Sequence, residues 1–214
     1  MKKRIFAAAL CLALSLTALA GCGPKEPAAG STPAGSTPSG SISAAAPADL
    51  KQITEAMAEG PTILTSVGQS ADVNVVQTLM KKCEIETDLN AVVKAEELGS
   101  YKTLVLAIGG SSKGLGAAGV DENQEMDRVN SVIAKAKENG MTIIALHIGG
   151  SARRGTLSDK FIPDALKACD AAIIVGEGDQ DGLMSGILAG TGAPTAVIDN
   201  QVGAINPLKV LFGK

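Results

Sequence analysis

Short apolar runs alternate with amphipathic segments through most of this 214-residue chain. The run Leu104–Ile108 leads directly into a loop with four glycines, and the apolar residues at 141–148 and 171–175 also end in glycine-rich loops. A short, continuously apolar run bounded by turn residues is typical of a strand buried on both faces. The six predicted strands are residues 62–67, 84–89, 104–108, 141–148, 171–175 and 195–199.

Apolar residues at helical spacing mark the segments between these strands. One such segment follows Ser70 and a longer one follows Asp121, and both residues are predicted helix N-caps. We expect residues 109–120 to form a loop. The predicted helices are residues 70–83, 121–139, 158–169, about 183–189 and 205–212, with a helical turn at 94–99.

Strands that alternate with helices predict an α/β fold, a doubly wound three-layer sandwich with a mostly parallel sheet. Two strand orders are compatible with this pattern, 3-2-1-4-5-6 and a flavodoxin-like 2-1-3-4-5-6. Strand three is the most continuously apolar, whereas strand two carries Glu84, Glu86 and Asp88. Burial therefore favours the flavodoxin-like order, with strand two at the edge. The switch point, where ligands bind in such sheets, then falls between strands one and three.

Residues 1–21 predict a lipoprotein signal peptide. A positively charged n-region, Lys2-Lys3-Arg4, precedes an apolar segment that is shorter than a typical membrane-spanning helix. The segment ends in Leu19-Ala20-Gly21-Cys22, which resembles the bacterial lipobox. That resemblance implies cleavage before Cys22 and a diacylglycerol thioether on its sulfur, hence an anchored protein on the extracytoplasmic face. The alternative is an ordinary secretory signal cut near Ala20.

Three further segments follow the signal peptide. Residues 22–47 begin with the lipidated Cys22 and then predict a disordered tether rich in Gly, Ser and Pro. About 25 such residues have a mean reach on the order of 25–30 Å. Residues 48–59 predict a short helical lead-in, and residues 60–214 form a single α/β domain.

Composition limits the partners of this domain. The formal net charge of −3 and the lack of a basic patch argue against nucleic acid. Aromatic residues make up 2% of the chain, which argues against sites that stack sugars or bases. No C-x-x-C motif occurs, and neither a metal nor a cofactor is expected. Cys83 and Cys169 are expected to be separate buried thiols, although the sequence leaves a disulfide between them open.

Glycine-rich loops at the predicted switch point form the candidate site. Glycines let backbone N–H groups approach an anion, and Ser, Lys or Arg side chains complete the contacts. The P-loop and G-x-G-x-x-G spacings are absent. Two alternatives stay open: the acids at 177–181 pair with the arginines, or the glycines serve only tight turns. The candidate ligand-binding residues are Gly68, Gln69, Ser70, Gly109, Gly110, Ser111, Ser112, Lys113, Gly114, His147, Gly149, Gly150, Ser151, Arg153 and Arg154.

No catalytic residue is assigned, and we expect a binding domain rather than an enzyme. Residues 110–114 match G-x-S-x-G, but a nucleophile elbow enters a helix at once, and residues 115–119 are expected to intervene. The single histidine, His147, lies at the end of the next strand and not after a late strand, which does not fit the hydrolase order. We expect it to be a hydrogen-bonded structural residue or a ligand contact.

The lipobox, the tether, I-G-G-S-S-K-G-L-G-A-A-G at 108–119 and H-I-G-G-S-A-R-R-G-T-L-S-D-K-F-I at 147–162 resemble a family of bacterial lipoproteins that carries the domain of unknown function six-three-zero-five. The resemblance covers roughly residues 60–214. It implies a secreted α/β domain and supplies no activity or catalytic residues.

The leading interpretation is a membrane-anchored extracytoplasmic domain that binds a small anionic ligand at the carboxyl ends of its strands. One alternative is a hydrolase or transferase that uses the same cleft. The other is an accessory module that contacts a membrane or transport protein.

Overall fold

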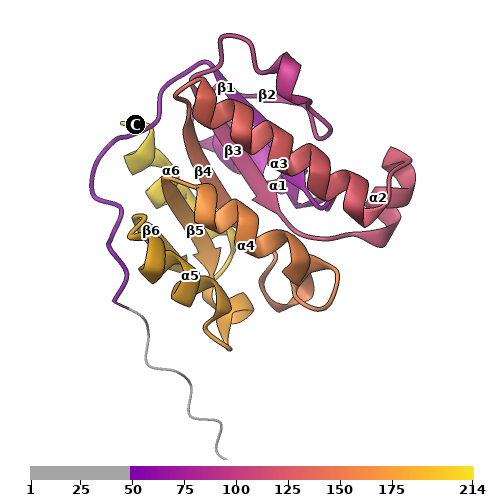
Figure 1. The fold of residues 1–214 in the computed structure, drawn as a ribbon. Helices are drawn as coiled ribbons and strands as arrows, with labels where there is room; N and C mark the ends of the chain where they lie inside the picture. The colour runs from indigo at the N-terminus through magenta and orange to yellow at the C-terminus, as the bar shows by residue number, and fades with distance from the viewer. Residues whose placement is uncertain (1–48) are drawn as a thin grey trace, which may run out of the picture. The chain divides into compact units, whose positions relative to one another are not determined.

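The computed structural model describes residues 49–214. Six parallel strands form one sheet in the order β2-β1-β3-β4-β5-β6 (Figure 1). This confirms the flavodoxin-like order and places the two-residue β2 at one edge. The strands are β1 (Thr62–Val67), β2 (Asp88–Leu89), β3 (Thr103–Ile108), β4 (Thr142–His147), β5 (Ala171–Val175) and β6 (Thr195–Ile198).

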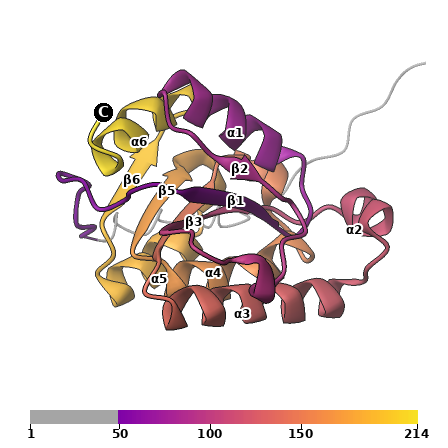
Figure 2. The ribbon, with the colours of Figure 1, turned by 90° about the horizontal axis from the view of Figure 1, so that it is seen from above.

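Helices cover both faces of the sheet, as a doubly wound fold requires. In the view from above, α1 and α6 lie on one face and α3, α4 and α5 on the other (Figure 2). The helices are α1 (Asp72–Lys82), α2 (Ser112–Ala118), α3 (Glu122–Glu138), α4 (Ser158–Ala168), α5 (Leu183–Thr191) and α6 (Ile205–Leu211). Short 3-10 turns are η1 (Ala95–Glu97), η2 (Gly150–Arg153), η3 (Gly176–Asp179) and η4 (Gln201–Ala204).

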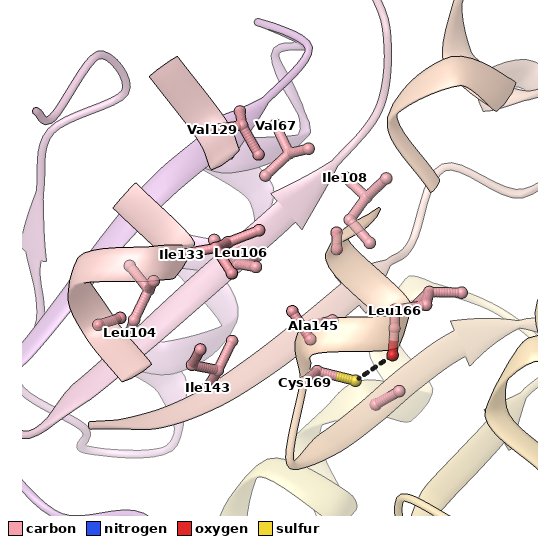
Figure 3. Close-up of a cluster of buried hydrophobic side chains, with 14 of the residues drawn as sticks. Val67, Leu104, Leu106, Ile108, Val129, Ile133, Ile143, Ala145, Leu166 and Cys169 are labelled. Carbon is pink, nitrogen blue, oxygen red and sulfur yellow. Dashed lines mark hydrogen bonds between the residues drawn. The ribbon is translucent and has the colours of Figure 1, made fainter. Parts of the chain in front are cut away.

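Strand β3 is the centre of the core, and all of its residues are buried. Leu104, Leu106 and Ile108 pack among side chains of α3 and α4 (Figure 3). Because side chains alternate along a strand, Val105 and Ala107 face the opposite cluster, beneath α1 and α6. The unbroken apolar run in the sequence therefore fills both faces of the sheet.

The prediction of a loop over residues 109–120 was wrong, because α2 occupies most of it. Two glycines inside α2 weaken its intrinsic helix propensity by roughly 1 kcal/mol each relative to alanine. The ends of the helix are capped: the Ser111 hydroxyl oxygen accepts a 3.0 Å hydrogen bond from the Gly114 amide, and Gly119 is left-handed at the C-cap. These caps compensate for the poor propensity.

The predicted helical lead-in was also wrong. Residues 49–59 are an extended strap along the amino ends of the strands. The Lys51 carbonyl accepts a 2.7 Å hydrogen bond from the Thr195 amide, and the Met57 and Ala58 amides both donate to the Leu211 carbonyl. A helix this short is marginal by itself, and the contacts with the domain favour the extended form.

Cys83 and Cys169 are free and lie in different core clusters, on opposite faces of the sheet. They therefore do not pair. Burial raises the pKa of both thiols, that of Cys169 to about 12, so both are protonated at pH 7. Figure 3 shows the Cys169 thiol donating to the Leu166 carbonyl at 3.3 Å.

The predicted signal peptide, the lipobox-like sequence at Leu19–Cys22 and the predicted tether lie outside the described residues. Between residues 49 and 214, none of the helices has the length and apolar character needed to span a bilayer.

Candidate functional site

The loops after β1 and β3 meet at the carboxyl end of the sheet, where the strand order places the switch point. Gln69 and Gly110 form an isolated bridge, and the Ser111 amide donates to the Gly68 carbonyl at 2.9 Å. Gln69 is left-handed, with φ of 60°. The Gly110 amide donates to the Ser158 hydroxyl at 3.0 Å. Several backbone N–H groups predicted to face an anion are therefore bonded within the protein.

Close packing between these loops explains their glycines. A Cβ at Gly68 would lie 2.7 Å from the Gly109 carbonyl oxygen, and one at Gly109 would lie 2.8 Å from the Ser70 hydroxyl. A Cβ at Gly114 would overlap the Gln69 carbonyl oxygen. This geometry favours the alternative in which the glycines serve the chain itself.

A groove of about 530 Å³ opens beside these loops, between the start of α1 and α2. Small apolar side chains form much of it, and no acidic side chain lines it. Lys113 is exposed and has no carboxylate partner within residues 49–214. The lining residues are Gln69, Ser70, Ala71, Val73, Asn74, Ala91, Ser111, Lys113, Gly114, Ala117 and Ala118.

Ser70 lies at this groove, although it is not the cap of α1 that the sequence predicts. Ala71 occupies the N-cap position and makes no side-chain cap. The Ser70 hydroxyl oxygen instead accepts a 3.3 Å hydrogen bond from the amide of Asp72, the first helical residue. Ser70 therefore stabilises the start of α1 from one position upstream.

Both arginines of the loop after β4 are paired with carboxylates. The Arg153 Nε donates to Asp72 Oδ2 at 2.9 Å and ties this loop to α1. Arg154 binds Asp159 and Asp181, each at 2.8 Å. Hydrogen bonds from Arg154 lower the pKa of Asp181 to about 2. Arg154 thus pairs with an acid of the 177–181 segment, as one alternative anticipated, and both arginines act within the fold.

His147 ends β4 and is fully buried. Its Nε2 lies 2.9 Å from the Arg153 carbonyl oxygen, and because a carbonyl only accepts, Nε2 carries the proton. Among residues 49–214, Nδ1 has no hydrogen-bond partner. Burial lowers the pKa of His147, and Arg154 lowers it further. The side chain is therefore neutral at pH 7, and its geometry fits the structural role.

Strand β3 and α2 supply the strand–turn–helix that G-x-S-x-G requires, contrary to the expectation of an interruption at residues 115–119. Ser112 nevertheless lacks two features of a nucleophile elbow. Among the described residues, the non-glycine positions with positive φ are Gln69 and Glu84, so Ser112 is not strained in this way. No hydrogen bond within the described residues joins Ser112 to His147.

A buried ion pair behind the β1 loop was missed by the sequence reasoning. Glu125 in α3 is 1% exposed, and Arg128 donates to both of its carboxylate oxygens at 2.8 Å. Glu125 Oε1 also accepts hydrogen bonds from the Gly68 amide and from Gln69 Nε2, each at 3.0 Å. This carboxylate therefore fixes the loop that forms one wall of the groove.

A weak signal for this pair is present in the sequence. By its position in the first turns of α3, Glu125 resembles an acid that favours the positive end of a helix. It also lies four residues before Val129, on the buried face of that helix. Arg128 follows three residues later and also donates to the carbonyls of Ser66 and Val93. A charged pair at this spacing beside the apolar stripe is the signal that could have found it.

The structure divides the predicted ligand-binding residues into two groups. The first group lies at the groove or in the loops and helix beside it: Gly68, Gln69, Ser70, Gly109, Gly110, Ser111, Ser112, Lys113 and Gly114. The second group comes from the end of β4 and the loop after it. These residues are held by internal contacts such as the 2.7 Å bond from Ser151 to Glu177: His147, Gly149, Gly150, Ser151, Arg153 and Arg154. None of the second group lines the groove.

These features define a flavodoxin-like α/β domain with an open groove at its switch point. The chain belongs to the family described as Domain of unknown function (DUF6305), which matches residues 59–212. No curated protein matches the sequence.

Two solved structures have distant similarity to the chain. A protein from Thermoplasma acidophilum, provisionally described as belonging to a GMP synthase, is 14% identical with a TM-score of 0.32. That match covers 51% of this chain and 46% of the Thermoplasma protein, so the chain spans about half the length of that protein. TesA is 12% identical with a TM-score of 0.27, over 50% of this chain and 71% of TesA.

Proposed function

We propose that the domain binds a small anionic ligand in the groove between α1 and α2. The observation that carries this proposal is the position of Lys113, which lines a groove without acidic side chains. Unlike Arg153 and Arg154, Lys113 has no carboxylate partner within the described residues. A cation left unpaired beside a concave surface is available to an anion from solution.

The groove offers three kinds of contact to such a ligand. Lys113 supplies a point charge. The Asn74 amide and the Ser111 hydroxyl supply hydrogen-bonding groups at the wall. Ala71 and Ala117 are among the small side chains that leave room for an aliphatic part. The groove has no aromatic lining, so ring stacking is not expected. A small carboxylate with an aliphatic body fits this set better than an aromatic ligand.

Thermal unfolding of the full chain with acetate, butyrate, succinate or inorganic phosphate tests the proposal. A ligand at 100 times its Kd stabilises the folded state by about 2.7 kcal/mol. For a domain of this size, that corresponds to a rise in Tm of roughly 5–10 °C. We expect at least one of these anions to raise Tm in a saturable way.

The variant Lys113→Ala separates binding in the groove from a general salt effect. We expect it to weaken the affinity about tenfold, because a charge-assisted contact is lost. Lys82→Ala is the matched control, since Lys82 is an exposed lysine at the other end of α1. If no anion raises Tm, or if both variants respond alike, the ligand is not held by Lys113 in this groove and the proposal is rejected.

We further propose that a lipid on Cys22 holds the domain at the extracytoplasmic face of the membrane. The support is the sequence Leu19-Ala20-Gly21-Cys22 directly after the apolar segment, followed by a tether-like composition. Metabolic labelling with an alkyne fatty acid is expected to label the wild-type protein and the Cys11→Ala control, but not Cys22→Ala. An unlabelled wild-type chain released near Ala20, or label retained in Cys22→Ala, contradicts the proposal.

A further inference from the structure

We infer that Glu125 and Arg128 are positioning residues for the groove, because they fix the β1 loop and, through it, the start of α2 that carries Lys113. Their role in binding rests on the proposed function. Their effect on the position of α2 does not depend on any ligand.

A continuous chain of hydrogen bonds connects α3 to α2. Glu125 Oε1 accepts from the Gly68 amide at 3.0 Å. The Gly68 carbonyl accepts from the Ser111 amide at 2.9 Å, and the Ser111 hydroxyl oxygen accepts from the Gly114 amide at 3.0 Å. The last of these bonds is the N-terminal cap of α2. A shift of the Glu125 carboxylate is therefore transmitted to the first turn of α2.

This series of hydrogen bonds matters because few other contacts hold α2 against the rest of the domain. Leu115 is the buried residue of α2, and the helix lies at the periphery of the domain, away from the layers that cover the sheet (Figure 2). A short helix with two internal glycines has too low a helix propensity to form without other contacts. Its cap, the contact of the preceding loop with the β1 loop and the bonds between Gly110 and Ser158 therefore determine where Lys113 lies.

The Glu125 carboxylate also holds Gln69, which lines the groove. Gln69 Nε2 donates to Glu125 Oε1 and to the Ala91 carbonyl, each at 3.0 Å. The backbone of Gln69 is left-handed, which is unfavourable for a residue other than glycine. Its carbonyl oxygen packs so closely on Gly114 that no Cβ would fit there. The anchored side chain thus maintains a backbone conformation that joins the two walls.

Arg128 holds the Glu125 carboxylate in one orientation. Burying a carboxylate is costly unless it has a charged partner and further hydrogen bonds. Arg128 supplies two parallel bonds of 2.8 Å to Glu125 and also donates to the Val93 carbonyl at 2.9 Å. Apolar residues of similar size often stabilise a core equally well. An ion pair at this position is therefore better explained by the geometry that it imposes on the β1 loop.

Residue-resolved amide hydrogen exchange on the full chain tests this inference. The double variant Glu125→Leu/Arg128→Met removes both charges and keeps apolar volume, so the fold is expected to persist. We expect exchange at the Gly68 and Gly114 amides to accelerate at least about tenfold, with no change at Ile173 in β5. Glu125→Gln is a second variant, which keeps the shape of the side chain but removes the charge and replaces one acceptor oxygen with an NH2 donor beside Arg128.

Glu122→Gln is the matched control, because Glu122 lies one turn earlier in α3 and binds Lys160 at the surface. It should leave the Gly68 and Gly114 amides unchanged. Equal exchange at these amides in wild type and in both variants at Glu125 overturns the inference. Acceleration of equal size at Ile173 also overturns it, because the pair would then act only on global stability.

Titration with butyrate and with inorganic phosphate forms the second arm. If the wild type binds either probe, the variants that loosen α2 should bind it at least about tenfold more weakly, whereas Glu122→Gln should bind it normally. Unchanged affinity despite faster exchange overturns the link between positioning and binding. If the wild type binds neither these probes nor acetate or succinate, the proposed function fails, and the exchange result still decides whether Glu125 and Arg128 position α2.

Discussion

His147 shows how one residue with functional chemistry is held within the fold. Its folded-state pKa lies below the ordinary value of 6.5 because the ring is buried and the charge of Arg154 disfavours a second proton, although the hydrogen bond to the Arg153 carbonyl and the charge of Asp72 oppose this effect. The unfolded chain therefore binds a proton that the folded chain does not. Its contribution to stability is fully present above about pH 6.5 and is lost as the pH falls below that value. We expect the free energy of unfolding in urea to decrease between pH 7 and pH 5.5.

The variant His147→Gln assigns this pH dependence. An amide nitrogen at this position can still donate to the Arg153 carbonyl, but it does not titrate. The free energy of unfolding should then change less between pH 7 and pH 5.5 than in the wild type. Most carboxylates titrate at lower pH and contribute little in this range. If wild type and variant have the same slope, His147 is not the group responsible.

At the scale of elements, strands were easier to predict than the segments between them. The apolar run at 171–175 coincides with β5, and the run at 104–108 covers all of β3 except Thr103, because burial on both faces leaves a direct signature in the sequence. Helix α2 has no such signature, since its caps and its contact with the β1 loop stabilise it. The strap at 49–59 has apolar residues at helical spacing but is extended, because it packs against both core clusters.

The candidate site was predictable only in part for the same reason. Strand order and the glycine-rich loops located the switch point, and the groove lies there. The sequence could not show that Arg153 and Arg154 are paired, because Asp72 is distant in the chain and several acids compete for Arg154. Nor could composition show that Glu125 faces inward. Charged residues are normally exposed, and only tertiary structure supplies the partners that permit burial.

At the scale of the whole molecule, the strap joins elements that are distant in the chain. It bonds to the starts of β3, β4 and β6 and to the end of α6. The described chain thus enters along the amino ends of the strands, whereas the groove lies at their carboxyl ends. If the chain is anchored at a point upstream of the strap, the strap does not cover the groove.

Thr103→Val tests whether the strap unfolds together with the domain. The buried Thr103 hydroxyl donates to the Glu59 carbonyl at 2.7 Å and accepts from the Glu59 amide at 3.1 Å. Valine keeps the shape of the side chain but removes both bonds, so the free energy of unfolding in urea should fall by about 1–3 kcal/mol. Thr78→Val, at an exposed position of α1, should change the free energy of unfolding by less than about 0.5 kcal/mol.

The m-value of Thr103→Val shows whether the strap unfolds with the sheet. An unchanged m-value would mean that the strap belongs to the same cooperative unit as the sheet. A reduced m-value with little change in the midpoint would mean that the strap opens first, and the cooperative domain would then begin at β1.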